Sequence, residues 1–359
     1  MVGLAIAERL SRRTRDVVVL EQAPRAGQGT SSRNSQVLHS GLYYPSGSLK
    51  ARLCLAGNRS LAAWCETHGV PMQRVGKLIV ATSQPEELAL DRLARQAEVN
   101  GVEGVEALDG RSVEALEPSV RAVAGLWVPS AGILDAHGLM DSLARVAVDR
   151  GVTIALRHRV EALELGPGGW SVEVSSGEER FRLKAQWVIN AAGLHADAIA
   201  TLAGLDVDAL GYRQQWVKGR YVRVKAGHRL SHLVYPVPPV GLTGLGVHLT
   251  IGLDGDVRLG PDVVPLETRV EDYAVDEGCL EAFHQAARRF LPSLALEALA
   301  PDTAGLRPKL SGAGGPWRDF VVAEESGHGC PGLVTLVGIE SPGLTSCLEL
   351  AGEVDGLAS

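Results

Sequence analysis

Three side chains in this sequence stand in local patterns that suit binding a small anion and taking a proton from it. Arg307 lies in Gly-Leu-Arg-Pro-Lys, and arginine offers a planar fork that holds a carboxylate through two hydrogen bonds. Pro308 stiffens the backbone beside it, and Gly305 allows a close approach of another chain segment. His39 and His248 are candidates for a general base, because the pKa of an imidazole lies near working pH.

The two histidines lie in different kinds of segment. His248 is in Gly-Val-His-Leu-Thr, whose alternation is typical of a strand, so its side chain points to one face only. His39 follows a polar loop at 28–35 that is rich in Ser, Thr and Asn. We therefore expect one base candidate on a sheet and one at the end of a loop.

The N-terminal segment carries part of a dinucleotide-binding pattern. Gly3 opens an Ala-rich helix, and Glu21 ends the β-branched run 17–20, which is typical of a buried parallel strand. Gly3 fits the third glycine of GxGxxG, and Glu21 fits the acidic residue that binds a ribose hydroxyl. The pattern's first strand and first two glycines would lie upstream of Met1, so two strand edges would be exposed and most pyrophosphate-binding amides would be missing. A misplaced start is favoured over a chain that binds its cofactor poorly.

Apolar spacing predicts the elements that would position these residues. Helices are expected at 2–10, 49–68, about 86–100, about 137–150, 277–290 and from 344 onward; strands are expected at 17–20, 78–80, 152–165, 170–184, 187–190 and 334–338, with an antiparallel sheet within 213–260.

This order of elements predicts an α/β fold, α+β overall, with βα units at both chain ends and strands between them. We expect a discontinuous Rossmann-like nucleotide-binding domain made of 1–75, 132–205 and 303–359. An antiparallel β-sheet substrate or cap domain, made of 76–131 and 206–302, would be inserted into it.

Composition argues against several classes of protein. The 359 residues are 45% hydrophobic with a net charge of −7 and no long basic stretch, which disfavours a nucleic-acid partner. No apolar run of ~18 residues would span a membrane, and no secretion signal is visible. The five cysteines, at positions 54, 65, 279, 330 and 347, never form CxxC, so neither a disulfide framework nor a metal site is expected. A reducing, cytoplasmic location is favoured.

Longer motifs resemble the L-2-hydroxyglutarate oxidase/dehydrogenase family, which lies in the D-amino-acid-oxidase-like superfamily of FAD enzymes. In family order, they are SRNS at 32–35, HSGLYY at 39–44, SLKA at 48–51, LC at 53–54, GI at 132–133, DAH at 135–137, NAAG at 190–193, KG at 218–219 with Tyr221, YPVP at 235–238, LGVHLT at 245–250, LGP at 259–261, GLRPK at 305–309 and GIESPGLTS at 338–346. NAAG and GLRP occur across the superfamily, whereas HSGLYY, YPVP, LGVHLT and GIESPGLTS are narrower. The sequence departs from the family at its N-terminus and in a shortened segment, 239–242.

The resemblance implies non-covalent FAD, since no flavin-linking Cys or His motif is present. The implied cofactor contacts are Gly3, Glu21, Gln22, Ser31, Ser32, Arg33, Asn34, Ser35, His39, Val160, Ala191, Ala192, Gly193, Arg307, Gly338, Ile339, Glu340, Ser341, Pro342, Gly343, Leu344 and Thr345. Gly343 and Leu344 are expected to begin the last helix, whose positive end would stabilise the reduced flavin. A second GxGxxG is absent, so electrons are expected to pass to oxygen, a quinone or another carrier.

The resemblance also implies a substrate and roles for the site residues. Arg307 would clamp the α-carboxylate of an L-2-hydroxy acid, with L-2-hydroxyglutarate the leading candidate. His248, on a strand that would cover the flavin, or His39 would take the hydroxyl proton while the hydride passes to the flavin. A second clamp would come from Lys218, Tyr44 or Tyr235, and Lys309 would hold either the flavin or a carboxylate.

Other residues are expected to be structural. Lys50 is expected on a solvated helix face, and Asp135 is expected to cap a helix that begins near His137.

Two further interpretations stay open from the sequence. The first is an amine or amino-acid oxidase of the same superfamily, which would share Arg307 and the fold. The second is a truncated chain with impaired FAD binding and no activity. Peripheral contact with the inner face of a membrane is a further hypothesis, because relatives pass electrons to a membrane quinone pool.

Overall fold

The computed structural model describes the whole chain except residues 15, 226–228, 239–245 and 312–314. The shortened segment 239–242 and Leu245 of LGVHLT therefore lie outside the described residues.

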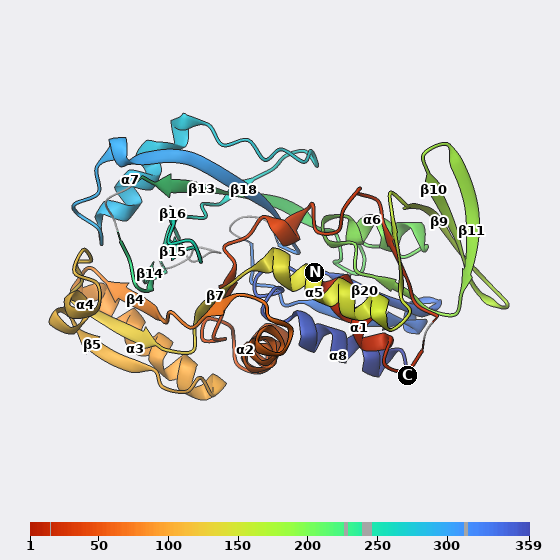
Figure 1. Ribbon diagram of the computed structural model, residues 1–359, viewed down its shortest axis with the longest axis horizontal. Coiled ribbons are helices and arrows are strands. Elements are labelled where there is room, and N and C mark those ends of the chain that lie inside the picture. The colour runs from red at the N-terminus through yellow and green to blue at the C-terminus, as the bar shows by residue number, and fades with distance from the viewer. Residues whose placement is uncertain (15, 226–228, 239–245, 312–314) are drawn as a thin grey trace.

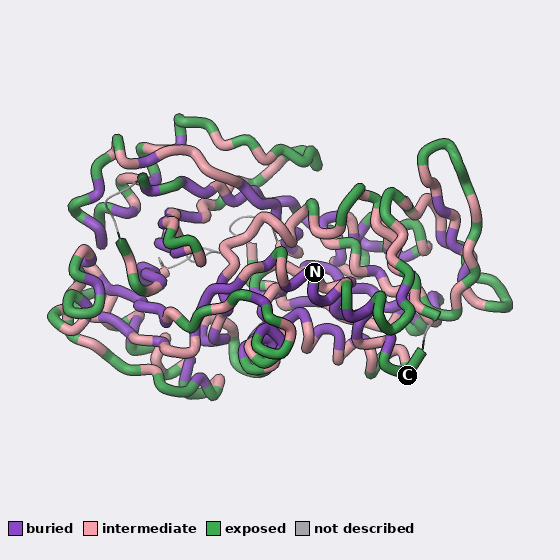
Figure 2. The backbone as a smooth tube through the Cα atoms, in the orientation of Figure 1, coloured by how far each residue is buried: buried purple, intermediate pink, exposed green. Residues whose placement is uncertain are grey.

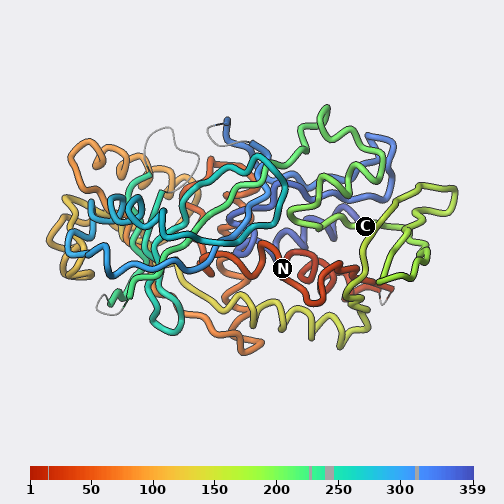
Figure 3. The backbone as a smooth tube through the Cα atoms, turned by 90° about the horizontal axis from the view of Figure 1, so that it is seen from above, coloured from red at the N-terminus to blue at the C-terminus, as the bar shows by residue number. Residues whose placement is uncertain are grey.

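The two chain ends fold together, as the sequence predicts. Helices α1 (Val2–Leu10), α5 (Ala136–Asp149) and α8 (Cys347–Leu357) pack around strand β20 (Cys330–Val337) in one half of the molecule (Figures 1 and 3). Their inward apolar residues form one buried cluster, which Figure 2 shows as purple tube in this half. Burial of a shared apolar face joins segments more than 300 residues apart in the sequence.

The strands of this half form two separate sheets. Strand β1 (Val18–Glu21) pairs in parallel with β8 (Thr153–Leu156). Strand β12 (Val188–Asn190) pairs in parallel with β20, and β19 (Val321–Glu325) pairs with β20 on its other side. Among the described residues, β1, β8, β12 and β19 each pair on one side only.

The other half is built on one nine-stranded sheet, labelled at the left of Figure 1. Its strands are β4 (Lys77–Ala81), β5 (Glu106–Asp109), β6 (Ala124–Val128), β13 (Gln215–Val224), β14 (Leu233–Pro236), β15 (Leu249–Ile251), β16 (Val257–Leu259), β17 (Val264–Pro265) and β18 (Leu299–Lys309). The pairings are antiparallel except for that of β4 with β14. Helices α3 (Gln84–Asn100), α4 (Gly110–Leu116) and α7 (Leu280–Arg288) pack against its strands.

The longest strand of this sheet crosses the expected domain boundary. Strand β18 pairs with β13 from Leu299 to Lys309, so position 303 lies within one continuous strand. The two long strands run side by side from the cap half into the centre of the molecule (Figure 1). They carry side chains of the cap sheet to the face of the other half.

The region 152–185 holds four strands where two were predicted. Strand β8 ends at Leu156 and β9 (Arg159–Gly166) starts after a break at Arg157, whose φ is +61°. The predicted glycine turn does join β9 to β10 (Gly169–Ser176). A further turn at Gly177, with φ +61°, leads to β11 (Glu179–Ala185); only glycine adopts this conformation readily.

The observed helix ends show which of the predicted helix bounds and caps are confirmed. Helix α1 has the predicted bounds, and Asp135 caps α5 by accepting from His137 N at 2.9 Å, as predicted. Helix α2 (Leu49–His68) is capped at its N-terminus by Ser48, whose Oγ accepts a hydrogen bond from Ala51 N at 3.1 Å. The last helix was predicted wrongly: it begins at Cys347, because residues 341–346 form consecutive turns before it.

The remaining elements are short. They include α6 (Ala196–Leu202), β2 (Val37–Leu38), β3 (Met72–Gln73), β7 (Gly132–Leu134) and single 3-10 turns. Within the residues that the structure describes, no helix combines the length and apolar character needed to cross a bilayer. The five cysteines are free and buried.

Candidate active site

A cavity of about 720 Å³ lies between the two halves, in the size range of small-molecule and cofactor sites. It is bordered at one end by the N-terminus of α1 and at the other by strands of the cap sheet. The predicted site residues that line it are Gly3, Ser31, Arg33, Asn34, Ser35, His39, Tyr44, Ala191, Gly193, Tyr235, His248, Arg307, Ile339, Glu340, Ser341, Pro342, Gly343 and Leu344.

Eight predicted residues do not line this cavity: Glu21, Gln22, Ser32, Val160, Ala192, Lys218, Gly338 and Thr345. Glu21 accepts a hydrogen bond from Ala23 N at 2.8 Å, and its carbonyl oxygen accepts from His158 N at 2.9 Å. These bonds tie the end of β1 to the segment that leads into β9. Ala192 lies between Ala191 and Gly193, which do line the cavity.

Lys218 faces away from the cavity because of strand alternation. Gly219, Tyr221, Gly305, Arg307 and Lys309 all line the cavity, and they are alternate residues of the paired strands β13 and β18. Successive side chains of a strand point to opposite faces, so Lys218 lies on the other face. There its Nζ donates to Asp272 Oδ2 at 2.7 Å. The structure thus does not bring Lys218 together with the other predicted clamp residues.

Arg307 lies in a slot left by a glycine. A Cβ at Gly219 would lie 2.7 Å from Arg307 Nη2, closer than a real side chain tolerates. Among the described residues, no carboxylate forms an ion pair with Arg307. The guanidinium therefore keeps its two-pronged donor face available to the cavity.

Gly305 lets β18 meet the polar loop of the other half. A Cβ there would lie 2.1 Å from the carbonyl oxygen of Arg33, so only glycine fits at this crossing, as the sequence predicts. Thr30 Oγ1 also donates to the carbonyl oxygen of Leu306 at 2.8 Å. These contacts fix Arg307 relative to the loop at 30–35.

His248 presents one free nitrogen to the cavity. Its Nδ1 lies 3.0 Å from the carbonyl oxygen of Gly246, and since a carbonyl only accepts, Nδ1 carries the proton. The other nitrogen, Nε2, is buried and has no hydrogen-bond partner among the residues that the structure describes. The imidazole stacks on Tyr235 with 3.7 Å between ring centroids. Burial lowers the pKa of His248 to about 3, so the ring is neutral at ordinary pH.

His39 is held by contacts from both halves of the chain. Its backbone N donates to Thr345 Oγ1 at 3.0 Å, and its carbonyl oxygen accepts from Asn58 Nδ2 at 2.9 Å. Its Nε2 lies 3.3 Å from Ser341 Oγ, which is also 3.4 Å from Tyr44 OH. Burial lowers the pKa of His39 well below its ordinary value. Thr345, outside the cavity, is thus a support for His39.

The predicted position of Lys50 was wrong. Lys50 is 3% exposed and lines the cavity. Its Nζ donates to Glu340 Oε1 at 3.1 Å, and Lys309 Nζ donates to Glu340 Oε2 at 2.8 Å. Burial alone would raise the pKa of Glu340, but the two ammonium groups outweigh it and hold that pKa below its ordinary value. We call Lys50, Lys309 and Glu340 the paired wall.

The turn at 341–346, next to the paired wall, is packed tightly against α2. A Cβ at Gly57 of α2 would lie 2.2 Å from the carbonyl oxygen of Thr345. Gly343 N donates to the carbonyl oxygen of Glu340, and Ser346 N donates to that of Pro342 at 3.0 Å. Four residues of this turn, 341–344, line the cavity. Backbone of a turn, and not the first residues of a helix, therefore borders the cavity here.

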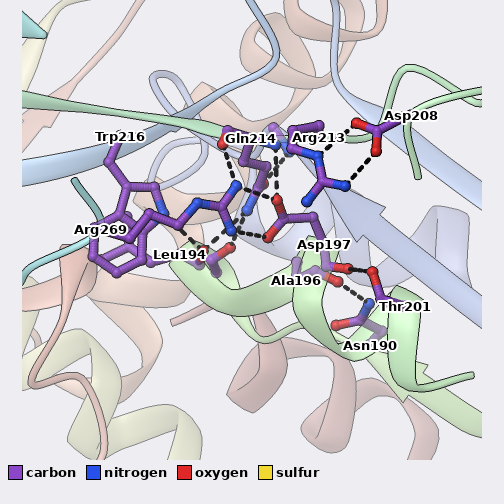
Figure 4. Close-up of polar contacts among 12 residues, drawn as sticks. Asn190, Leu194, Ala196, Asp197, Thr201, Asp208, Arg213, Gln214, Trp216 and Arg269 are labelled. Atoms are coloured by element: carbon purple, nitrogen blue, oxygen red, sulfur yellow. Dashed lines mark hydrogen bonds and ion pairs between the residues drawn. The ribbon is translucent and has the colours of Figure 1, made fainter. Parts of the chain in front are cut away.

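A buried network that sequence reasoning missed joins the NAAG turn to Gly338 (Figure 4). Gln214 donates through Nε2 to the carbonyl oxygen of Gly193 at 2.9 Å, and its Oε1 accepts from Gly338 N at 2.7 Å. Buried Asp197 accepts from Gln214 N at 2.9 Å and pairs with Arg269. Their partners are distant in sequence, so no local signal marks these residues.

Comparisons with known proteins show the family of this chain. Residues 1–354 match the family described as FAD dependent oxidoreductase. The chain is 38% identical to the mitochondrial L-2-hydroxyglutarate dehydrogenase of Arabidopsis thaliana, over 99% of this chain and 80% of that protein. It is 30% identical to the mitochondrial enzyme of that name from Caenorhabditis elegans, over 98% and 89%, and 29% identical to the L-2-hydroxyglutarate dehydrogenase of Escherichia coli strain K12, over 93% and 84%.

Solved structures show the same fold. The dithionite-reduced L-alpha-glycerophosphate oxidase from Mycoplasma pneumoniae, with FAD bound, superimposes with a TM-score of 0.87 at 26% identity, covering 99% of this chain and 92% of that one. The glycine oxidase from Geobacillus kaustophilus superimposes with a TM-score of 0.80 at 21% identity, covering 99% and 91%. The second likeness shows the fold alone.

The cavity has features that fit FAD. Its lining includes backbone without side chains at Gly193, whose φ is +59° and beside which a Cβ would meet nothing within 4 Å. Gly3 lies at the N-terminal end of α1, where backbone amides and the helix dipole favour a phosphate. Arg33 lines the cavity with a buried Nε that has no partner among the described residues. Gly3, Arg33 and Gly193 would hold the dinucleotide part, and the turn 341–344 the flavin.

Proposed function

The chain belongs to the FAD dependent oxidoreductase family and has FAD as its cofactor, and from this premise we propose that it oxidises L-2-hydroxyglutarate to 2-oxoglutarate. The proposal draws on the curated relatives, which are named L-2-hydroxyglutarate dehydrogenases. The observation that carries it is the pairing of Arg307 with His248 across one cavity. A carboxylate clamp and a proton acceptor are the two groups that a 2-hydroxy acid requires.

FAD supplies the acceptor for the hydride that leaves the substrate's carbon 2. Arg307 holds the α-carboxylate in its guanidinium fork, which fixes the orientation of that carbon. His248 takes the hydroxyl proton at Nε2, because Nδ1–H is held by the carbonyl oxygen of Gly246. Loss of this proton and of the hydride turns the CH–OH group of the substrate into a ketone.

The charge of the substrate assists His248. A pKa of about 3 makes a free imidazole a weak base, but an anion bound beside it favours its protonated form and raises that pKa. Arg307 lowers the pKa of His248 in the free enzyme, and a carboxylate bound to Arg307 would neutralise that effect. Substrate binding would therefore strengthen the base.

A second carboxylate would bind to hydroxyl donors. Tyr235 OH is buried and has no hydrogen-bond partner in the described part of the chain, and Tyr44 lines the same cavity. We propose these two for the distal carboxylate of L-2-hydroxyglutarate. His39, held between Thr345 and Ser341, would position Ser341 and Tyr44.

The test is anaerobic reduction of the FAD-loaded protein. We expect L-2-hydroxyglutarate to bleach the flavin absorbance, and D-2-hydroxyglutarate, sarcosine, glycine and D-alanine not to. Bleaching by an amine or amino acid instead would contradict the proposal and favour an amine oxidase. Reoxidation of the bleached flavin by oxygen, by a soluble quinone or by another carrier would then identify the electron acceptor.

The cytoplasmic location and a peripheral contact with a membrane stay hypotheses. The plant and worm relatives carry the word mitochondrial in their names, which concerns those proteins. Fractionation of cells that produce this chain would decide between the soluble and membrane-bound fractions.

A further inference from the structure

Lys77, a lysine that sequence reasoning did not single out, is buried behind Tyr235 and does not line the cavity. Lys77 begins β4 and has an exposed fraction of 0%. Its Nζ has no hydrogen-bond partner among the described residues. A buried ammonium without a partner is costly, so its presence calls for an explanation beyond packing.

Lys77 faces the ring of Tyr235. Strands β4 and β14 are parallel neighbours, with Lys77 opposite Leu233 and Tyr235 two residues further along the same face. Lys77 Nζ lies 4.0 Å from the centroid of the Tyr235 ring, a cation–π distance. It lies 5.5 Å from the ring centroid of Tyr43.

Tyr235 separates Lys77 from His248. The imidazole of His248 stacks on Tyr235 with 3.7 Å between centroids and 19° between ring planes. Since the imidazole covers one face of the phenol ring at this distance, the ammonium lies over the other face. The three groups form a layered stack, which we call the unpaired wall.

No carboxylate balances this stack in the described part of the chain. The titratable groups that face it are one cysteine, one histidine, three tyrosines and one arginine: Cys54 of α2, His39, Tyr43 and Tyr44 of the preceding segment, Tyr221 of β13, and Arg307 of β18. Burial raises the pKa of the Cys54 thiol, so Cys54 stays neutral and supplies no counter-charge. The remaining groups are neutral or cationic.

The order of protonation follows from this arrangement. Burial lowers the pKa of Lys77 to about 7, whereas that of His248 lies at about 3. As the pH falls, the first proton therefore goes to Lys77, and its charge then opposes protonation of His248 and His39.

We propose that Lys77 is a residue that acts through the ring of Tyr235 to lower the proton affinity of His248 in the substrate-free enzyme, beyond what burial alone does. This inference rests on the proposed role of His248 as the base. It assigns to a buried cation the task of tuning the base from behind, on the side away from the substrate.

The experiment follows the imidazole directly and needs no turnover. Wild-type protein and the Lys77→Met variant, both FAD-loaded and labelled with carbon-13 at histidine Cε1, are titrated by NMR from pH 8 down to pH 2, with the fold followed by the amide signals. The His248 signal is assigned by its loss in His248→Gln. Lys50→Met is the matched control, because it removes a buried lysine whose charge is paired with Glu340.

We expect the titration midpoint of His248 to rise by about 1 to 2 pH units in Lys77→Met, the size for a charge about 8 Å away at an effective dielectric of about 20. Lys50→Met should leave it in place. Lys77→Gln, also neutral, serves if Lys77→Met does not fold. An unchanged His248 midpoint in a folded, neutral Lys77 variant would overturn the inference.

This outcome is independent of the substrate test. If hydroxy acids fail to bleach the flavin but the His248 midpoint moves, the proposed function fails while the coupling between Lys77 and His248 stands. If the flavin is bleached and the midpoint does not move, the reverse holds.

Discussion

Buried lysines lie in two walls around the cavity, the paired wall and the unpaired wall. Their ammonium groups have carboxylate partners in the first wall and none among the described residues in the second. In the paired wall, Lys50 shares Glu340 with Lys309, and every ammonium has an oxygen partner. In the unpaired wall, Lys77 has no oxygen partner among the described residues, and its ammonium lies over the π-face of Tyr235. A paired charge fixes geometry, whereas an unpaired one shifts the pKa of its neighbours.

The difference teaches how one cavity can separate two tasks. The paired wall adjoins the turn at 341–344, which we assign to the flavin, and its charges are already satisfied without a ligand. The unpaired wall includes His248 and lies near Arg307, and we assign these two residues to the substrate. Changes in the first wall should therefore alter cofactor binding, and changes in the second should alter chemistry.

Replacing the base gives the largest expected effect. His248→Gln keeps a polar side chain of similar size but removes the proton acceptor, so flavin reduction should slow by about 10²- to 10⁴-fold. FAD should remain bound, which the absorbance of the purified variant would show. Loss of FAD with an unchanged rate in reconstituted protein would reassign His248 to structure.

Removing the clamp is expected to be nearly as severe. Arg307→Ala leaves the substrate carboxylate without its partner, which costs about 2–5 kcal/mol for such buried charge pairs. KM for L-2-hydroxyglutarate should rise by about 10²-fold or more, measured by steady-state kinetics. An unchanged KM would remove Arg307 from the site.

Neutralising Lys77 should stabilise the fold while it raises the pKa of His248. The folded pKa of Lys77, about 7, lies below the ordinary value of 10.5, so between these values the unfolded chain binds the proton that the folded chain does not. Wild-type stability attributable to Lys77 therefore rises with pH across this window.

At pH 7, Lys77→Met should gain about 2–4 kcal/mol in the free energy of unfolding, and the gain should shrink toward pH 10. Urea unfolding at several pH values measures it. A variant less stable than wild type at pH 7 would show that Lys77 is satisfied in the folded state.

Adding a methyl group beside Arg307 gives the smallest expected effect on activity. Gly219→Ala places a Cβ 2.7 Å from Arg307 Nη2 and 2.9 Å from Pro261 Cβ, so the guanidinium must move away, raising KM about 3- to 10-fold. Gly168→Ala is the matched control, because a Cβ there meets nothing within 4 Å. Equal KM values for the two variants would argue against the slot at Gly219.

Local patterns in the sequence were enough for the frame of the molecule and for part of the site. Helix α1 was predicted at its bounds, because its apolar spacing is not interrupted. Arg307 and His248 were placed in one site by the resemblance of their motifs to a known family, and both line the cavity. Gly305 was recognised as a close approach, although the sequence could not say that Arg33 makes it.

The wrong predictions for individual lysines arise because the residues that surround them are distant in the sequence. Lys50 was expected in solvent because its helix is polar at that turn, and its partner Glu340 lies 290 residues away. Lys218 was expected in the site, but its pairing with β18 decides which face it takes. Lys77 stands next to an apolar strand and carries no local sign of burial. Only the packed structure shows these outcomes.

The separation of the two walls is tested most directly by a crossed pair of measurements on Lys50→Met and His248→Gln. For each variant, the dissociation constant of FAD and the rate constant for anaerobic flavin reduction by L-2-hydroxyglutarate are measured. We predict that Lys50→Met weakens FAD binding by about 10-fold or more, with a reduction rate of the loaded protein within about threefold of wild type. His248→Gln should show the reverse. A slower rate in Lys50→Met equal to that in His248→Gln would contradict the account.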